Sequence, residues 1–311
     1  MQQQHKSTLQ LVIQIQCLRE YISMTTPTLI KKLSIATAAM VTVINIISAQ
    51  AAHAAAVRTG LFNTNTLPRN DDESTGLVGL GFTANFFGLD FNQAYVNNNG
   101  NITFDSPLST FTPFNLTSTG RQIIAPFFAD VDTRNPSSSE VTYGTGTVDG
   151  RNAFGVNWVN VGYFFSAADK LNSFQLVLID RSDTGVGNFD IEFNYDKIQW
   201  ETGDASEGSG GLGGNSARAG FSNGTGAPGT FFELAGSAVN GAFLDGGPNS
   251  LIANTLNSNV DGRYIFTARN GIITVPPTDV PEPTTLIGLL GLGTFSITSH
   301  LKRSQKQSVK C

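Results

Sequence analysis

The clearest pattern of hydrophobic and polar positions lies between residues 189 and 200. Large apolar side chains alternate there with polar ones, with the period of two that is typical of a half-buried strand: Phe189, Ile191, Phe193 and Tyr195. The apolar phase then shifts by one residue to Ile198 and Trp200, which predicts a β-bulge near Asp196 and Lys197. We expect residues 174–179 to form the neighbouring strand.

The remainder of residues 55–269 also reads as short strands separated by turns. Asn97–Asn101 contains Asn-Gly between two apolar pairs, and Asp149–Gly150 lies between two further strands, so both predict tight hairpins. The nearly continuous apolar run 123–131 predicts a strand buried on both faces, with Pro126 at a bulge or an edge. The predicted fold class is all-β, an antiparallel β-sandwich-like single domain with Gly- and Asn-rich loops.

Two segments of this region are predicted to differ from the strands around them. Residues 251–256 read as one short helix. Residues 201–215 are polar and rich in glycine, without an apolar cluster, so we expect a mobile loop outside the core. Residues 270–279, which include Pro276 and Pro277, are predicted to be a stiff linker.

The C-terminal segment 280–311 has a different character. Its apolar positions are interrupted only by small residues and carry no charge: Leu286, Ile287, Leu289, Leu290, Leu292, Phe295 and Ile297. A helix over residues 284–301 would measure about 27 Å, which is just enough to cross a hydrocarbon core. Lys302 and Arg303 follow and predict that this end is cytoplasmic. The alternative is a buried amphipathic helix, against which the glycines and the missing polar face argue.

The order of parts in this tail resembles the PEP-CTERM sorting signal of exported bacterial proteins. Val280, Pro281, Glu282 and Pro283 form the motif, the apolar span follows, and the basic residues close the segment. The resemblance implies an exosortase-type partner that processes the chain near the motif after export, and a surface or extracellular-matrix destination. Whether the tail is cleaved or retained stays open.

The N-terminal residues predict export as well. Residues 1–23 are rich in glutamine and are unlike the start of an exported protein, so we interpret them as an extension and Met24 as the initiator. Residues 24–54 then read as a signal peptide, with Lys31 and Lys32, an apolar middle and small residues before a cleavage site after Ala51 or Ala54. The alternative is an N-terminal membrane anchor, for which the apolar run is short.

Composition narrows the function of the segment between these two signals. Residues 55–281 hold 22 of the 24 acidic residues and 11 of the 19 basic residues, a net charge near −11, which argues against nucleic acid as a partner. The segment contains no histidine and no cysteine. A Ser-His-Asp or Cys-His nucleophile and a His- or Cys-ligated zinc site are therefore excluded within it.

Five sequence blocks in this segment resemble the extracellular nidogen-like (NIDO) domain. They are residues 95–104, 123–132, 174–178, 193–200 and 219–224. In animals such domains occur in basement-membrane and mucosal adhesion proteins and are linked with cell–matrix adhesion. The resemblance implies a non-enzymatic domain. It departs from the usual animal pattern at Phe128, where tryptophan is common.

The remaining candidate chemistry rests on carboxylates. Asp130 and Asp132 are two residues apart on a predicted strand, so their side chains share a face and are candidate Ca²⁺ ligands. The alternative is that they cap the strand end and pair with Arg134. Asp130, Asp132, Glu192 and Glu201 could also supply a glycoside hydrolase pair, although the sequence does not give their separation. An aromatic sugar platform drawn from 158 and 163–165 competes with simple core packing.

The sequence therefore predicts an exported bacterial surface or extracellular-matrix protein without catalytic residues. Its expected role is cell–matrix adhesion or a structural role in biofilm, with matrix or exopolysaccharide as partner and the membrane contacted through the C-terminal helix. No cofactor is predicted apart from the calcium ion considered above. The alternative is a Ca²⁺-dependent carbohydrate-binding or carbohydrate-active exoprotein.

Overall fold

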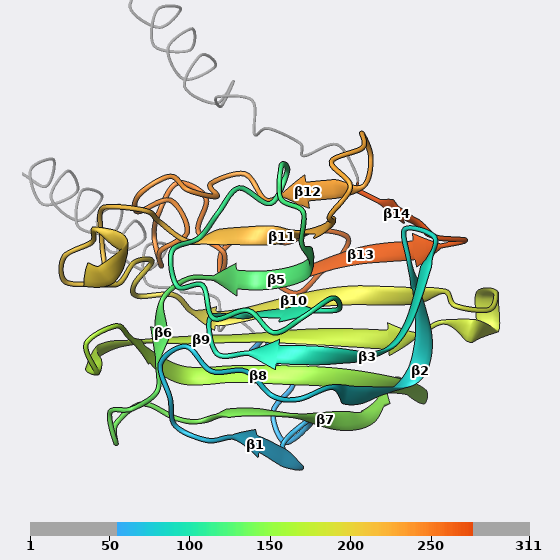
Figure 1. Ribbon diagram of the computed structural model, residues 1–311, viewed down its shortest axis with the longest axis horizontal. Coiled ribbons are helices and arrows are strands. Elements are labelled where there is room, and N and C mark those ends of the chain that lie inside the picture. The colour runs from blue at the N-terminus through green and yellow to red at the C-terminus, as the bar shows by residue number, and fades with distance from the viewer. Residues whose placement is uncertain (1–54, 276–311) are drawn as a thin grey trace, which may run out of the picture. The chain divides into compact units, whose positions relative to one another are not determined.

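The computed structural model describes residues 55–275, and these residues form two antiparallel sheets with almost no helix (Figure 1). The eight-stranded sheet has the order β1-β7-β8-β9-β10-β13-β14, and β6 pairs with β8 beside this path. Its strands are β1 (Asn65–Leu67), β6 (Val131–Asp132), β7 (Val141–Val148), β8 (Arg151–Tyr163), β9 (Ala167–Asp180), β10 (Phe189–Lys197), β13 (Arg263–Arg269) and β14 (Ile272–Thr274).

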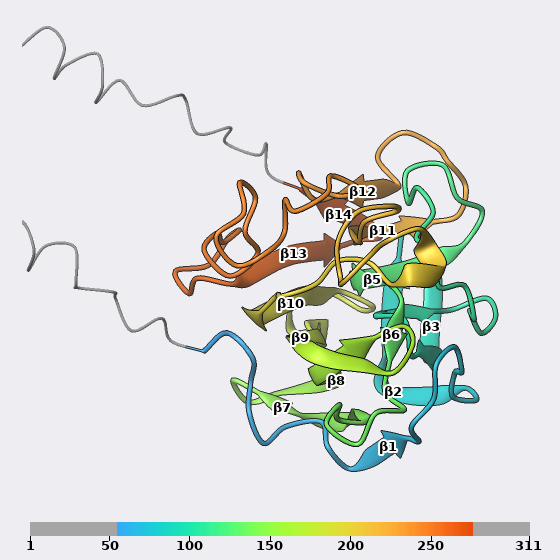
Figure 2. The same cartoon turned by 90° about the vertical axis from the view of Figure 1, so that its left-hand side faces the viewer.

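The six-stranded sheet has the order β12-β11-β5-β4-β3-β2. Figure 2 shows the strands of this sheet beside those of the larger one, so that the two sheets form separate layers. The strands are β2 (Val78–Phe86), β3 (Leu89–Asn97), β4 (Asn101–Thr103), β5 (Gln122–Phe128), β11 (Arg218–Asn223) and β12 (Phe231–Glu233). The prediction of an all-β fold built from antiparallel strands is confirmed.

The strand pairs and turns read from the sequence occur in the structure. β10 pairs with β9, and its register shifts between Tyr195 and Lys197, where the change of apolar phase predicted a bulge. Asn97–Asn101 joins β3 to β4, and Asp149–Gly150 joins β7 to β8. Pro126 lies in β5 where the pairing with β11 is irregular, because a proline cannot donate to the ladder.

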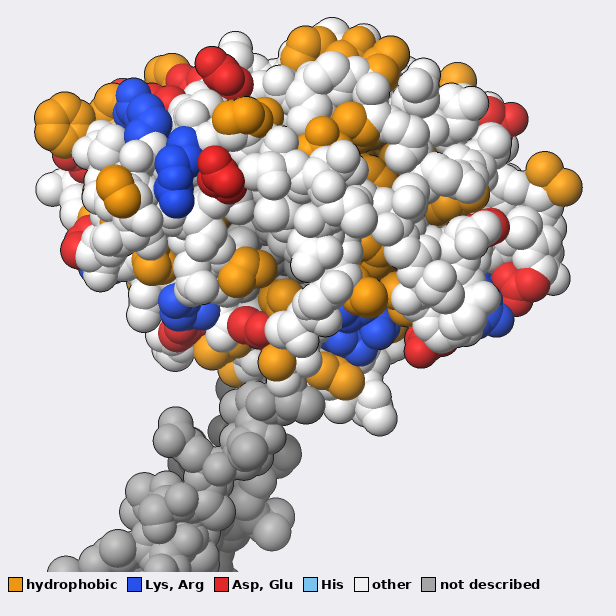
Figure 3. Space-filling view, turned by 90° about the horizontal axis from the view of Figure 1, so that it is seen from below, with side chains coloured by type: hydrophobic (Ala, Val, Ile, Leu, Met, Phe, Trp, Pro, Cys, Tyr) orange, Lys and Arg blue, Asp and Glu red, His pale blue; other side chains and the backbone are white. Residues whose placement is uncertain are grey.

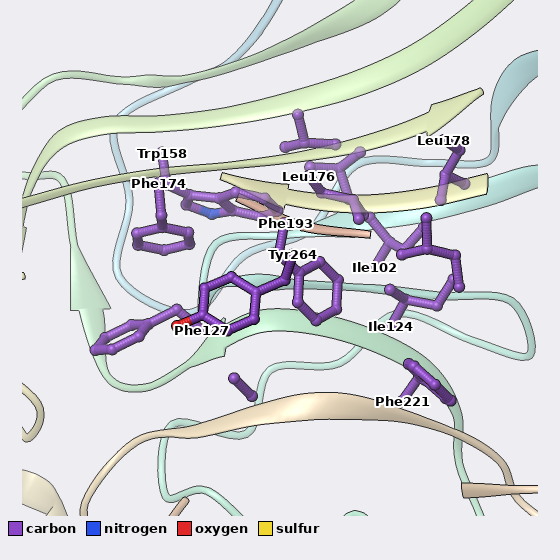
Figure 4. Packing of buried hydrophobic residues seen from close by; sticks show 14 of the residues in the cluster. Ile102, Ile124, Phe127, Trp158, Phe174, Leu176, Leu178, Phe193, Phe221 and Tyr264 are labelled. Carbon is purple, nitrogen blue, oxygen red and sulfur yellow. The ribbon is translucent and has the colours of Figure 1, made fainter. Parts of the chain in front are cut away.

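The core lies between the sheets and is rich in aromatic rings (Figure 4). Trp158 of β8 stacks on Phe174 of β9 at a centroid distance of 5.2 Å, and Phe127 of β5 contacts Phe174 at the same distance. The polar atoms of these large residues are satisfied inside the core. Trp158 Nε1 donates to the carbonyl of Asn98 (2.9 Å), and the Tyr195 hydroxyl donates to the carbonyl of Pro126 (2.6 Å).

Three predictions made from local sequence differ from the structure. Residues 251–256 form turns rather than a helix, and Leu251 is buried in the core. Within 201–215, predicted to lie outside the core, Glu201, Thr202 and Ser206 are buried, and a short 3-10 turn (η2, Asp204–Ser206) forms. The predicted linker 270–279 begins with a turn and β14, because Ile273 finds a buried position beside β13.

The predicted signal peptide (24–54) and sorting tail (280–311) lie outside the described residues. Among residues 55–275, the structure contains no helix that could cross a membrane. Figure 3 shows one face of this described part, on which acidic and basic side chains are interspersed and hydrophobic side chains occur in small groups. On this face no single sign of charge dominates, although the segment as a whole is acidic.

Candidate functional site

Three carboxylates from two distant segments meet beside the end of β5. Oxygen atoms of Asp71, Asp72 and Asp130 lie within 4.8 Å of one another. Asp71 and Asp72 belong to the loop that follows β1, and Asp130 lies between β5 and β6. Asp130 is buried, whereas Asp71 and Asp72 are partly exposed, so this group, the acidic site, reaches from the core to solvent.

The loop that carries Asp71 and Asp72 is shaped by its own asparagine. The side-chain oxygen of Asn70 accepts a hydrogen bond from the amide of Glu73 (2.8 Å), which turns the chain tightly. Asn70 is also tied to the segment after β6, since its amide donates to Thr133 Oγ1 (2.9 Å) and its carbonyl accepts from the Thr133 amide (2.9 Å). These bonds place the loop against the strand end that bears Asp130.

The Asn-rich hairpin between β3 and β4 connects the parts of the acidic site. Asn98 is fully buried, and its Nδ2 donates to the carbonyls of Asp71 (2.6 Å) and Val131. Asn99 Nδ2 donates to Asp72 Oδ1 (2.8 Å), while Asn99 Oδ1 accepts from the amide of Val131 (2.9 Å). The two asparagines therefore hold both the loop and the strand end through their side chains.

Asp130 lacks the partners that its neighbours have. The side chain is 1% exposed, and neither of its carboxylate oxygens has a hydrogen-bond partner within the described structure. Gly203 approaches it so closely that a Cβ there would lie 2.5 Å from Asp130 Oδ2. A buried polar group without a partner costs about 1–3 kcal/mol, and more when it is charged. Burial of the Asp130 carboxyl without a partner therefore costs the folded domain free energy.

Asp132, the second carboxylate singled out from the sequence, is bound differently. Its Oδ2 lies 2.5 Å from Arg134 Nη2, and the amide of Ser166 donates to the same oxygen (2.7 Å). Arg134 also contacts Asp71 Oδ2 at 2.9 Å. For Asp132 the structure thus matches the alternative interpretation, a strand-end acid paired with Arg134. Asp130 and Asp132 lie close in sequence but have different surroundings.

The pKa values within this cluster reflect burial and mutual repulsion. Burial raises the pKa of Asp130 to about 8, and the carboxylates of Asp71 and Asp72 add to the rise. Burial also raises the pKa of Asp71 to about 6, with Asp132 and Asp72 as further causes. For Asp132, burial opposes ionisation, but hydrogen bonds from Arg134 and Ser166 outweigh it and lower the pKa.

The other acids considered as catalytic candidates are committed to structural contacts. Glu192 is buried and accepts two hydrogen bonds from Arg58, at 2.7 and 2.9 Å. Glu201 is buried and accepts from the amides of Gly241 (2.5 Å) and Phe243 (2.7 Å), so it joins the chain after β10 to the region after β12. The structure does not bring either of them into the acidic site.

The aromatic residues considered as a sugar platform are divided between core and surface. Trp158 and Tyr163 are buried in the core, whereas Phe165 is 81% exposed. Phe164 and Phe165 have ring centroids 6.2 Å apart, at a turn between β8 and β9. The core-packing interpretation therefore holds for Trp158 and Tyr163.

Sequence reasoning missed Asp71 and Asp72. Both lie in a loop without an apolar pattern, and their approach to Asp130 depends on side-chain bonds from a hairpin elsewhere in the chain. A usable signal was present in the density of asparagine in 97–101. Four asparagines among five residues exceed what the turn itself requires, and all four are buried.

Comparisons with known proteins find relatives among alpha-tectorins and nidogen. Alpha-tectorin from mouse is 37% identical over 231 residues, which cover 66% of this chain and 10% of the relative, and human alpha-tectorin is 36% identical over the same length. Nidogen from Drosophila melanogaster is 28% identical over 232 residues, or 16% of its length. The chain thus spans about a tenth of the alpha-tectorins. No solved structure matches it.

The family comparison covers most of the described sheets. The nidogen-like domain family matches residues 92–270, a range that begins in β3, ends after β13 and includes more than half of the chain. It contains the Asn-rich hairpin, Asp130 and the buried pair Trp158 and Phe174. The chain belongs to the nidogen-like (NIDO) domain family.

Proposed function

We propose that this protein is an exported, non-enzymatic component of the extracellular matrix or cell surface that acts through contacts of its nidogen-like domain. The observation that carries the proposal is membership of the nidogen-like family over residues 92–270. Its relatives include alpha-tectorin and nidogen, of which this chain matches only a small part. Adhesion or matrix structure, rather than turnover, is the role that this family suggests.

The side chains of the described domain support a role without catalysis. Glu192 and Glu201, two of the four acids considered for glycoside hydrolysis, hold separate segments of the fold together through Arg58 and two backbone amides. Asp132 is held by Arg134 and Ser166. Residues 55–275 contain no histidine or cysteine. A hydrolase would need a free acid and base at a suitable separation.

The route to the surface is a further part of the proposal. The order of Pro281-Glu282-Pro283, an apolar span and the basic pair Lys302 and Arg303 supports sorting by an exosortase-type enzyme, after export directed by residues 24–54. The apolar span would anchor the chain in the membrane until processing. In a bacterial cell the domain would then join the matrix or biofilm.

Cell fractionation tests the location and role together. We expect the protein in the surface or matrix fraction, with an N-terminus near residue 52 or 55 and a C-terminus near Pro283 by mass spectrometry. Cells that lack the protein should release matrix polysaccharide more readily under shear. Recovery of the chain only from the cytoplasm would refute export. Release of reducing ends from matrix polysaccharide by the purified protein would refute a non-enzymatic role.

A further inference from the structure

We propose that Asp71, Asp72 and Asp130 form a Ca²⁺ site that joins the loop after β1 to the core of the domain. The proposal concerns the acidic site described above, in which oxygens of the three carboxylates lie within 4.8 Å of one another. Ca²⁺ is coordinated by oxygen at 2.3–2.6 Å. Three oxygens at this mutual separation can therefore surround one ion.

The strongest support is the state of Asp130. Neither of its oxygens has a hydrogen-bond partner among residues 55–275, although the residue is 1% exposed, and one of them lies near the carboxylates of Asp71 and Asp72. Asp71 Oδ1 is also buried and has no hydrogen-bond partner in the described part of the chain. Buried charges in proteins are paired or coordinate metals. A cation between these oxygens would supply the partner that no described side chain provides.

A second side chain beside the acidic site, that of Asn98, also has a buried oxygen without a hydrogen-bond partner in the described structure. Asn98 is fully buried, and its Oδ1 has no hydrogen-bond partner within the described structure. Its Nδ2 is fully used, since it donates to the carbonyls of Asp71, a member of the acidic site, and of Val131, the residue after Asp130. An amide oxygen is a common Ca²⁺ ligand. Asn98 is therefore the candidate fourth protein ligand.

The charge of the region also favours a divalent ion. Among residues 55–275, one cationic side chain forms ion pairs with this cluster: Arg134 contacts Asp71 and Asp132, and no ion pair within this range involves Asp72 or Asp130. Arg134 is itself 45% exposed. One bound Ca²⁺ would offset the charge of the two remaining carboxylates.

The donor set indicates calcium rather than a smaller or softer metal. All candidate ligands are oxygens, and residues 55–275 contain no His or Cys for zinc or copper. Mg²⁺ demands near-octahedral geometry and retains its water, whereas Ca²⁺ accepts six to eight oxygens in irregular arrangements. Asp71 and Asp72 are partly exposed, so the ion can enter from solvent and complete its shell with water.

Calcium titration of the purified full-length protein tests the proposal. After treatment with EDTA and its removal, isothermal titration calorimetry with CaCl₂ should show one site, and MgCl₂ should bind at least tenfold more weakly. Asp130→Asn and Asp72→Asn should each weaken Ca²⁺ binding at least tenfold. Glu140→Gln, which removes the same charge from an exposed residue outside the site, should bind as wild type does.

Thermal unfolding gives an independent reading that does not depend on heat of binding. At a Ca²⁺ concentration about a hundred times the Kd, the melting temperature of the wild type should rise by about 5–10 °C. Asp130→Asn should fold and lose this rise. Absence of both heat and a melting shift at 10 mM CaCl₂, equal binding of Mg²⁺, or wild-type affinity in Asp130→Asn would each overturn the proposal.

Discussion

Gly100 is expected to be among the least replaceable residues of the Asn-rich hairpin. Its φ angle is +72°, which disfavours any residue with a Cβ, and an added Cβ would lie 1.8 Å from the carbonyl oxygen of Phe127. The clash is with backbone, which cannot rotate away as a flexible side chain would. The ring of Phe174 lies 3.3 Å from the same Cβ position, so the hairpin cannot shift freely toward the core.

The cost of Gly100→Ala has two parts that a second variant separates. The left-handed backbone costs about 1–2 kcal/mol for a residue with a Cβ. Overpacking against the Phe127 carbonyl adds about 1–3 kcal/mol. Gly150 has a similar φ of +77° but nothing within 4 Å of the added Cβ. Gly150→Ala should therefore cost about 1–2 kcal/mol, and Gly100→Ala about 2–5 kcal/mol.

Urea unfolding at 25 °C, followed by tryptophan fluorescence, measures both variants. The buried residues Trp158 and Trp200 report on the core directly. The midpoints of the two variants should differ while the dependence of free energy on urea stays that of wild type. Equal losses of stability in Gly100→Ala and Gly150→Ala, within about 0.5 kcal/mol, would refute the close approach of Gly100 to Phe127.

Two further predictions concern the acidic site and its support by Asn98, and a third concerns the segment that Glu201 anchors. Asn98→Ala removes the donor to the carbonyls of Asp71 and Val131 and should lower the free energy of unfolding in urea by about 2–5 kcal/mol. The exposed control Asn63→Ala should change it by less than about 0.5 kcal/mol. A loss below about 1 kcal/mol for Asn98→Ala would contradict the two hydrogen bonds. In EDTA, the free energy of unfolding should fall as pH rises from 5 to 8.5. Burial raises the pKa of Asp130 to about 8 and that of Asp71 to about 6, whereas both groups titrate near 4 in the unfolded chain. The folded state therefore binds these protons more tightly than the unfolded chain does. This contribution is fully present below about pH 4 and is lost as pH passes the folded-state pKa values; an equal fall in Asp130→Asn would show that Asp130 is not its source. Glu201→Ala leaves the amides of Gly241 and Phe243 without their acceptor. It should lower the melting temperature in differential scanning calorimetry by about 4 °C or more. An unchanged melting temperature would contradict the anchoring role of Glu201.

Local sequence was sufficient for those features whose cause is local. The alternation in 189–195 sets which side chains of β10 face the apolar core, and the shifted phase at Ile198 required the bulge that the pairing with β9 contains. The prediction that β10 is only half-buried is wrong, because the polar side chains on its other face, Asp190, Glu192 and Asn194, are buried as well. Asn-Gly and Asp-Gly supplied the positive φ values of two hairpins. Strand period and turn chemistry depend on neighbouring residues, so a single sequence reveals them.

The segments that were mispredicted depend on contacts with distant residues. Residues 251–256 have an apolar content that suits a helix, yet Leu251 is taken into the core as part of a turn. The glycine-rich segment after Trp200 lacks an apolar cluster, but Glu201 secures it through the amides of Gly241 and Phe243. Hydrogen bonds to a remote backbone leave no periodic trace in the sequence.

For the acidic site, some properties follow from the sequence and others only from the tertiary structure. The sequence alone determined an all-β, acidic, histidine-free domain and drew attention to Asp130 and Asp132. Only the fold decided that Arg134 and the Ser166 amide hold Asp132 while Asp130 is left unpartnered beside Asp71 and Asp72. The physical reason is that burial and pairing of a charge depend on three-dimensional neighbours, which here come from the loop after β1 and the hairpin between β3 and β4.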